Sequence, residues 1–258
     1  MRVLVTRAEK ASQKTAAHLL ALGHEPILIP LAKAVHTPQN ALTALEKPHS
    51  ALIITSAEAV RALEIIKAQI TPHFSTPLFV VGSATAKAAE RLGFQKIETA
   101  DGDGTQLANL LGRQATPNSA PLLYLAGSPR AKALERGLQA KALSFDVAEI
   151  YDMETITYQA DDISHALGNQ PIDAVLLYSA ETARRFCALP LTDKVEELFA
   201  SLDCFCLSEQ VAQNLTLPFQ TRIYIADHPD EESLFALLES ANSSNEIKSP
   251  LSFRFIPD

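Results

Sequence analysis

Short apolar runs alternate along the chain with longer stretches whose apolar residues recur at helical spacing. The apolar runs have the length of buried strands, and the stretches between them have the length of ordinary helices. In the first helical stretch, Ala16, Leu19, Leu20 and Gly23 share one face, and Gly23 favours the end of the helix. This alternation is typical of α/β proteins with a parallel sheet.

Six of the apolar runs end at a hydroxyl residue that opens the next helical segment. These residues are Thr6, Ser56, Ser83, Ser128, Ser179 and Ser208. A Ser or Thr at this position caps the helix N-terminus, where free N–H groups also favour anions. Any one junction is more simply a helix cap, and Thr6 with Glu9 fits a capping box. Because parallel strands end at a common ligand crevice, however, six such junctions predict an anion site built from backbone donors.

Two kinds of unit each occur twice, which indicates an internal duplication. A strand–helix–strand unit at 3–31 recurs at 122–151, and the series 51–111 resembles 174–238. Two domains could be built sequentially or by exchange of these units. We favour exchange, because the crossovers 31–37 and 152–158 are β-prone, as in a two-stranded hinge.

The expected fold is therefore two parallel-sheet, three-layer α/β domains joined by a two-stranded β-ladder hinge, with a ligand cleft between them. Residues 1–33 plus 158–241 form a discontinuous first domain, and residues 37–152 form the second. Residues 242–258 lose the periodicity, and we expect them to form a C-terminal tail outside the core.

Composition narrows the function. Apolar residues make up 47% of the chain and charged residues 20%, as in ordinary globular proteins. A net charge of −8 without a dense Lys/Arg block disfavours nucleic acid and anionic membranes as partners. The N-terminus lacks the apolar core of a signal peptide, no apolar stretch approaches the ~20 residues of a membrane span, and three scattered cysteines fit reduced thiols. These features predict a cytoplasmic protein.

No motif for a metal or a cofactor is present. The segments at 81–87 and 126–132 lack the glycines of a phosphate-binding loop, and the seven histidines lack metal-site spacing. Cys204 and Cys206 are expected to be buried small side chains. The DGDG run at 101–104 is better explained as a turn before a helix than as a calcium loop, and the acidic stretch 227–233 complements the dipole of the last helix. We expect neither a metal nor a cofactor.

An ordered series of motifs over most of residues 1–240 resembles the uroporphyrinogen-III synthase family. The motifs are VTR (5–7), IITSAEAV (53–60), VVGSATA (80–86), YLAG (124–127) followed by Arg130, VAEIY (147–151) and LLYSAETARRF (176–186). The resemblance implies two α/β domains joined by a β-ladder, the first made from both chain ends. It also implies a lyase of haem biosynthesis that needs no cofactor. Linear hydroxymethylbilane, which carries eight carboxylates, would lose water and close into uroporphyrinogen III after inversion of its last pyrrole ring through a spiro intermediate.

The same resemblance implies roles for individual residues. Tyr151 matches the tyrosine suggested to assist departure of the hydroxyl, although a tyrosine at a hinge is more often simply packed. Thr85 matches the family's cleft threonine, Ser56 and Ser179 match the serines of two SAE-type loops, and Arg7 would lie at the mouth of the cleft. The neighbouring residues expected to bind substrate are Thr55, Ala57, Gly82, Ser83, Ala84, Ser128, Arg130, Tyr178, Ala180 and Ser208.

The chain departs from the family pattern at two positions. Ala8 replaces the proline that commonly follows VTR, and Val211 replaces a threonine in the loop after residue 206, which leaves Ser208 and backbone amides there. We expect the protein to be a monomer whose only partner is its small-molecule substrate. The alternative is a non-catalytic bilobal binding protein for a small polycarboxylated or phosphorylated ligand, because a hinged α/β pair suits ligand capture.

Overall fold

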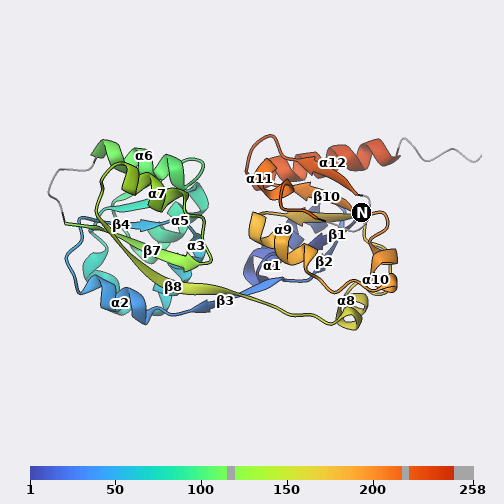
Figure 1. Cartoon of the computed structure of the whole chain (residues 1–258), viewed down its shortest axis with the longest axis horizontal. Coiled ribbons are helices and arrows are strands. Elements are labelled where there is room, and N and C mark those ends of the chain that lie inside the picture. The colour runs from blue at the N-terminus through green and yellow to red at the C-terminus, as the bar shows by residue number, and fades with distance from the viewer. Residues whose placement is uncertain (115–119, 217–220, 247–258) are drawn as a thin grey trace, which may run out of the picture. The chain divides into compact units, whose positions relative to one another are not determined.

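The computed structural model describes residues 1–114, 120–216 and 221–246. The chain divides into two compact units, Met1–Lys33 with Thr155–Asp258 (the first unit) and Ala34–Glu154 (the second unit). Each unit has its own β-sheet with helices on both faces (Figure 1). The predicted class of fold, parallel-sheet α/β, is therefore confirmed.

The first unit contains a five-stranded parallel sheet. In spatial order its strands are β11 (Arg222–Ile225), β10 (Asp203–Cys206), β9 (Ala174–Leu177), β1 (Arg2–Val5) and β2 (Glu25–Leu28). Two helices pack on one face, α1 (Glu9–Ala21) and α12 (Glu231–Glu246). The other face is covered by α8 (Ala160–Ala166), α9 (Ala180–Cys187), α10 (Asp193–Leu198) and α11 (Glu209–Ala212). The sheet thus lies between two separate apolar cores.

The second unit has a six-stranded sheet. Its spatial order is β3 (Ala32–His36), β8 (Phe145–Thr155), β7 (Leu122–Ser128), β4 (Ala51–Ile54), β5 (Leu78–Val81) and β6 (Ile97–Ala100). One face carries α2 (Gln39–Leu45), α3 (Ala57–Ile65), α4 (Lys67–Ile70), a 3₁₀ turn (Thr71–His73) and α5 (Ser83–Leu92). The opposite face carries α6 (Gly104–Gln114) and α7 (Ala133–Ala140). This unit is also three-layered.

Within the part of the chain that the structure describes, strand β3 is the one antiparallel member of this sheet. The backbone N–H of Thr37 donates to the carbonyl of Ile150 (2.8 Å), and that of Ile156 donates to the carbonyl of Leu31 (3.1 Å). One residue number rises as the other falls, as antiparallel pairing requires. The two crossover segments of the chain therefore pair with each other as a two-stranded ladder.

The two sheets correspond strand for strand. The order β2-β1-β9-β10-β11 in the first unit matches β8-β7-β4-β5-β6 in the second. Each sheet thus combines one strand–helix–strand unit with a three-strand series from elsewhere in the chain. This is the arrangement expected when duplicated segments exchange partners.

Several local predictions need correction. Leu20 is 62% exposed, because α1 buries Ser12, Thr15, Ala16 and Leu19 instead. Helix α12 continues through Glu246, so residues 242–246 belong to it and not to a tail, and residues 247–258 lie outside the described residues.

Only two of the six junction hydroxyls form the predicted side-chain cap. Ser56 accepts a hydrogen bond from the N–H of Glu58, and Ser179 accepts one from that of Thr182 (both 3.1 Å). Ser208 stands at the N-cap of α11 without such a bond. The other three do not cap: Thr6 is buried and donates to the carbonyl of Leu176, Ser83 is the first residue of α5 after Gly82, and Ser128 ends β7. The capping box of Thr6 and Glu9 is absent, because α1 begins after Ala8.

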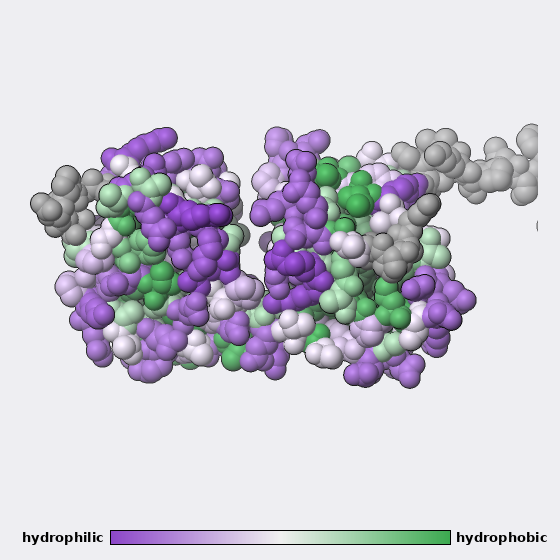
Figure 2. Space-filling model, viewed as in Figure 1, coloured by the Kyte–Doolittle hydropathy of each residue, from purple (hydrophilic) through white to green (hydrophobic). Residues whose placement is uncertain are grey.

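The visible face of each unit is mostly hydrophilic, with small scattered apolar patches (Figure 2). Apolar side chains gather in the cores on the two sides of each sheet. Among the described residues, no helix combines the length and apolar character needed to cross a membrane.

The caps provide a matched test of local stability. Ser179→Ala should lower the free energy of unfolding by about 1 kcal/mol, because the N–H of Thr182 loses its acceptor. Ser208→Ala, at an N-cap without a side-chain bond in the same unit, should cost clearly less. Urea unfolding of both variants measures the difference, and equal losses would contradict the assignment of the cap.

Candidate active site

Most of the predicted site residues gather at the carboxyl edge of each parallel sheet. In the second unit, Thr55–Ala57 follow β4, Gly82–Thr85 follow β5, and Ser128 and Arg130 end or follow β7. In the first unit, Arg7 follows β1, Tyr178–Ala180 follow β9, and Ser208 follows β10.

Tyr151 is aimed by a β-bulge. The register between β7 and β8 shifts so that Ala126 faces Glu149 and Gly127 faces Tyr151, which leaves Ile150 as an extra residue. A bulge of this kind turns the following side chains to the other face of the strand. Ile150 is buried in the core beneath α3 and α5, and Tyr151 packs against the same core. Without the shift, Tyr151 would point to the opposite face of the sheet.

The ring of Tyr151 lies directly against the backbone of Gly127. A Cβ atom at position 127 would be 2.1 Å from Cζ of Tyr151 and 2.4 Å from its hydroxyl oxygen. Only glycine leaves room for the ring here.

The surroundings of Tyr151 favour its protonated form. Burial raises the pKa of its hydroxyl above the usual 10.0, a hydrogen bond with Ser56 opposes this, and the charge of Glu58 raises the pKa further. At neutral pH the phenol therefore keeps its proton.

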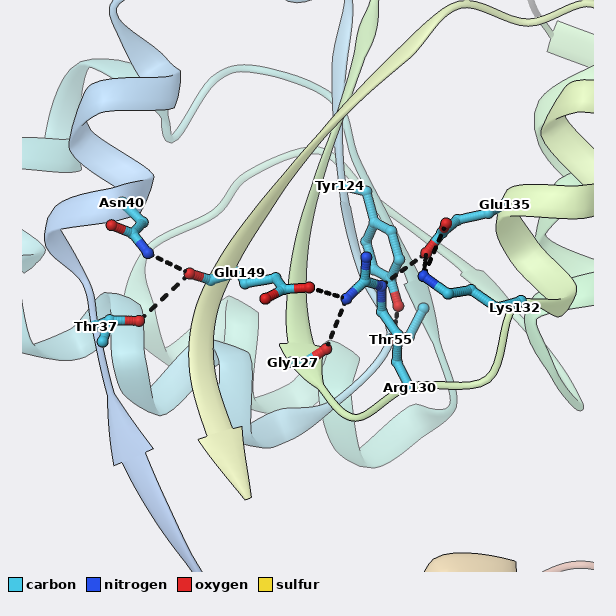
Figure 3. A network of polar contacts seen from close by, with 9 residues as sticks. All are labelled: Thr37, Asn40, Thr55, Tyr124, Gly127, Arg130, Lys132, Glu135 and Glu149. Atoms are coloured by element: carbon cyan, nitrogen blue, oxygen red, sulfur yellow. Dashed lines mark hydrogen bonds and ion pairs between the residues drawn. The ribbon is translucent and has the colours of Figure 1, made fainter. Parts of the chain in front are cut away.

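Arg130 is held by two carboxylates and a carbonyl (Figure 3). Its Nε donates to Glu135 Oε1 (2.7 Å), and its Nη1 donates to Glu149 Oε1 (2.5 Å) and to the carbonyl of Gly127 (3.3 Å). Lys132 also pairs with Glu135 (3.0 Å). Burial acts to raise the pKa of Glu135, but the hydrogen bonds and charges of Lys132 and Arg130 outweigh it and lower that pKa. The guanidinium therefore has a fixed place at the edge.

The same network reaches β3, α2 and β4. The backbone carbonyl of Glu149 accepts hydrogen bonds from Asn40 Nδ2 (2.7 Å) and Thr37 Oγ1 (3.3 Å), as Figure 3 shows. The guanidinium of Arg130 lies 5.9 Å from the ring centre of Tyr124, and the hydroxyl of Tyr124 shares a hydrogen bond with Thr55 (2.9 Å). Thr55, expected to bind substrate, thus forms part of the support for Arg130.

A second arginine cluster lies at the edge of the first unit. Arg7 stacks on the ring of Tyr178, with Cζ 4.0 Å from the ring centre. One oxygen of Glu231 accepts hydrogen bonds from Arg7 (2.7 Å), Thr15 (2.8 Å) and Tyr178 (2.8 Å). Burial and the charge of Glu231 raise the pKa of Tyr178, so its hydroxyl remains the donor to that carboxylate.

Helix α5 begins after a glycine with a positive φ. Its N-cap is Gly82 with a φ of +77°, a conformation that favours glycine, and no side chain caps it. The first N–H groups of a helix have no partner within the helix, and Ser83 and Ala84 are exposed. Thr85, in contrast, is buried, with only 5% of its surface exposed. Val211, at the position of a family threonine, is likewise buried.

Several acidic or basic residues near these sites have no role in the sequence-based prediction, among them Glu149 and Lys132 beside Arg130. Glu231 was assigned only to the helix dipole, and Glu58, Glu135 and His36 were given no role. Their positions in first turns of helices or beside Tyr151 were readable, but which charges they meet depends on strands distant in sequence. Among the described residues, no group of three His, Cys, Asp or Glu side chains is arranged to hold a metal ion.

Comparison with solved structures assigns the fold to a class. The structure resembles uroporphyrinogen-III synthetase from Helicobacter pylori 26695 (TM-score 0.64, 18% identity, 93% of this chain and 100% of that chain covered). It also resembles a mutant uroporphyrinogen III synthase from the extremely thermophilic bacterium Thermus thermophilus (TM-score 0.59, 17% identity, 96% and 100% covered). At these identities the likeness shows a shared two-domain α/β fold.

The sequence itself identifies the family. The family model for uroporphyrinogen-III synthase HemD matches residues 13–236, which is most of the chain, whereas no curated protein sequence matches it. The chain belongs to the uroporphyrinogen-III synthase family, cyclising lyases that act on a small molecule in tetrapyrrole biosynthesis.

The contact between Gly127 and Tyr151 predicts strong coupling. Gly127→Ala should lower the free energy of unfolding by about 2 kcal/mol, because the new methyl group overlaps the ring. In a Tyr151→Ala background the same change should cost much less. Urea unfolding of the two single variants and the double variant gives the coupling energy, expected to exceed about 1 kcal/mol. An equal cost in both backgrounds would mean that the ring does not require glycine.

Proposed function

We propose that this protein converts hydroxymethylbilane into uroporphyrinogen III and that residues at both carboxyl edges bind the substrate. The family membership of residues 13–236 is the observation that carries this proposal. The proposed reaction breaks the bond between carbon and the terminal hydroxyl, releases water, inverts the last pyrrole ring and closes the macrocycle.

The chemistry of the edges suits a substrate with many carboxylates. The protein carries a net charge of −8, so long-range electrostatics do not attract such a substrate. Local donors have to bind it: the N–H groups at the starts of α3, α5 and α9, and the guanidinium groups of Arg7 and Arg130. Ala57 and Ala180 begin α3 and α9, whereas Ser128 ends β7 and Ser208 stands at the N-cap of α11; all four would contribute mainly backbone groups.

Tyr151 is the proposed proton donor to the departing hydroxyl. Its pKa is raised, so it holds its proton at neutral pH but is a weak acid. The carbon that loses the hydroxyl is already activated by its pyrrole ring, so weak acid assistance suffices. Most of the catalysis would then come from holding the chain in the conformation that closes with the last ring inverted.

We further propose that the protein acts in the cytoplasm as a monomer, with no nucleic acid or membrane partner. The acidic net charge and the hydrophilic visible faces in Figure 2 support this proposal.

The product isomer tests the proposed function directly. Freshly made hydroxymethylbilane incubated with the protein should give uroporphyrinogen III, whereas heat-denatured protein should leave only the uncatalysed isomer I. Chromatographic separation of the two isomers measures the outcome. Isomer I alone with the folded protein would favour the alternative of a non-catalytic binding protein.

Substitution of Tyr151 tests its role in the reaction. Tyr151→Phe keeps the ring against Gly127 but removes the proton, so kcat should fall roughly 10-fold while product affinity stays close to that of the wild type. Initial rates of isomer III formation and a product titration measure the two effects. An unchanged rate would remove Tyr151 from the mechanism.

A further inference from the structure

His36 on β3 lies opposite Tyr151 on the neighbouring strand β8. The bond from Thr37 N–H to the carbonyl of Ile150 makes these two residues opposite partners, and the bond from Ile156 to Leu31 fits the same register. The next pair along the ladder is His36 with Tyr151. It falls between hydrogen-bonded pairs, where opposite Cα atoms are about 4.5 Å apart and the side chains share one face.

The side chain of His36 holds an acidic residue on that face. Its Nε2 lies 2.7 Å from Oε1 of Glu58, and the other oxygen of Glu58 accepts a hydrogen bond from Arg61. The side chains of His36 and Glu58 are only 23% and 15% exposed. Both oxygens of the carboxylate are therefore occupied, and it cannot rotate freely.

Helix α3 brings this carboxylate to the phenol. Ser56 caps α3 and hydrogen-bonds Tyr151, and Glu58 stands two residues later in the first turn. The charged or titratable groups that act on Tyr151 are Glu58 and Arg61 from α3, with His36 beside it on β3. Gly127, on β7, closes the other side of the ring.

We propose that His36, Glu58 and Arg61 are positioning residues that hold the Tyr151 phenol in its protonated form and in a fixed place. His36 and Arg61 hold the Glu58 carboxylate beside the phenol, and the negative charge favours the protonated hydroxyl over the phenolate. None of the three needs to touch the substrate. This inference rests on the proposed function, because the hydroxyl it concerns is the proposed proton donor.

The charge of Glu58 is tested by a kinetic double-mutant cycle. Glu58→Gln should lower kcat roughly three- to tenfold with little change in KM, because the phenol loses the charge beside it and substrate contacts remain. In a Tyr151→Phe background the same change should have almost no effect on kcat. An equal loss in both backgrounds would indicate a purely structural role and overturn the inference.

Titration of the phenol gives a readout that a folding defect would not mimic. In protein labelled with ¹³C at tyrosine Cζ, the Tyr151 signal is assigned by its loss in Tyr151→Phe. Glu58→Gln should lower the pKa of Tyr151, and Arg61→Gln should raise it, because the two charges act on it in opposite directions. Shifts in the same direction, or no shift in either variant, would contradict the proposal.

The histidine has a matched control in the same unit. His36→Gln keeps a hydrogen-bond donor toward Glu58 and should retain most of the activity, whereas His36→Leu should resemble Glu58→Gln. His49 forms a similar pair with Asp146 (3.2 Å) near the amino ends of β4 and β8, so His49→Leu should leave kcat unchanged in folded protein. If wild-type protein makes only isomer I, the proposed function fails. If it makes isomer III and both His36 variants match it, only this inference fails.

Discussion

Parallel pairing of the strands is the constraint on which both clusters depend. Ten of the described strands, five in each sheet, run parallel to one another. The carboxyl ends of the five strands therefore lie at one edge of each sheet, and in eight of the ten strands a helix of the same unit follows that end. Arg7 and Glu231, at opposite ends of the chain, meet at one such edge. In the second unit the same constraint places Thr55, Arg130 and Tyr151 at another.

A shift of one residue converts this general edge into a specific site. The bulge at Gly127 brings Tyr151 to the face that α3 covers, where the helix cap Ser56 and the carboxylate of Glu58 already lie. The glycine is required for space, since its neighbour's ring occupies the volume of a Cβ atom. The bulge therefore determines which charged residues lie near the hydroxyl of Tyr151.

The architecture could be predicted from the sequence better than the side-chain contacts could. Periodicity predicted the strands and helices, and the repeat order fitted the exchanged strand order, because both depend on patterns local to each segment. The hydroxyl residues at strand ends predicted helix caps less reliably: Thr6 hydrogen-bonds the carbonyl of Leu176 on β9, and Ser128 is the last residue of β7. The partners of His36 and Glu231 could not be predicted. His36 meets Glu58 because of the register of β3, and Glu231 meets Arg7 more than 200 residues away in the sequence. Patterns within a single sequence encode neither contact.

The two predicted substrate-binding arginines differ in how available they are. Arg130 pairs with Glu149, whose side chain is 54% exposed, and with Glu135, whose side chain is 16% exposed. A substrate carboxylate that reached Arg130 would return Glu149 to water and leave Glu135 in place. Because exposed ion pairs are worth only about 0–1 kcal/mol, this exchange adds little net affinity. It does fix the position of one carboxylate, so its contribution is to orientation.

Arg7 has no comparable partner to release. Its carboxylate, Glu231, is 26% exposed and also accepts hydrogen bonds from Thr15 and Tyr178, so removing it would leave two further donors without an acceptor. A carboxylate that approached Arg7 would therefore meet it together with Glu231, as a nearly neutral pair stacked on an aromatic ring. The duplicated edges have thus diverged in chemistry: one offers an arginine that can exchange its partner, and the other a fixed, charge-compensated surface.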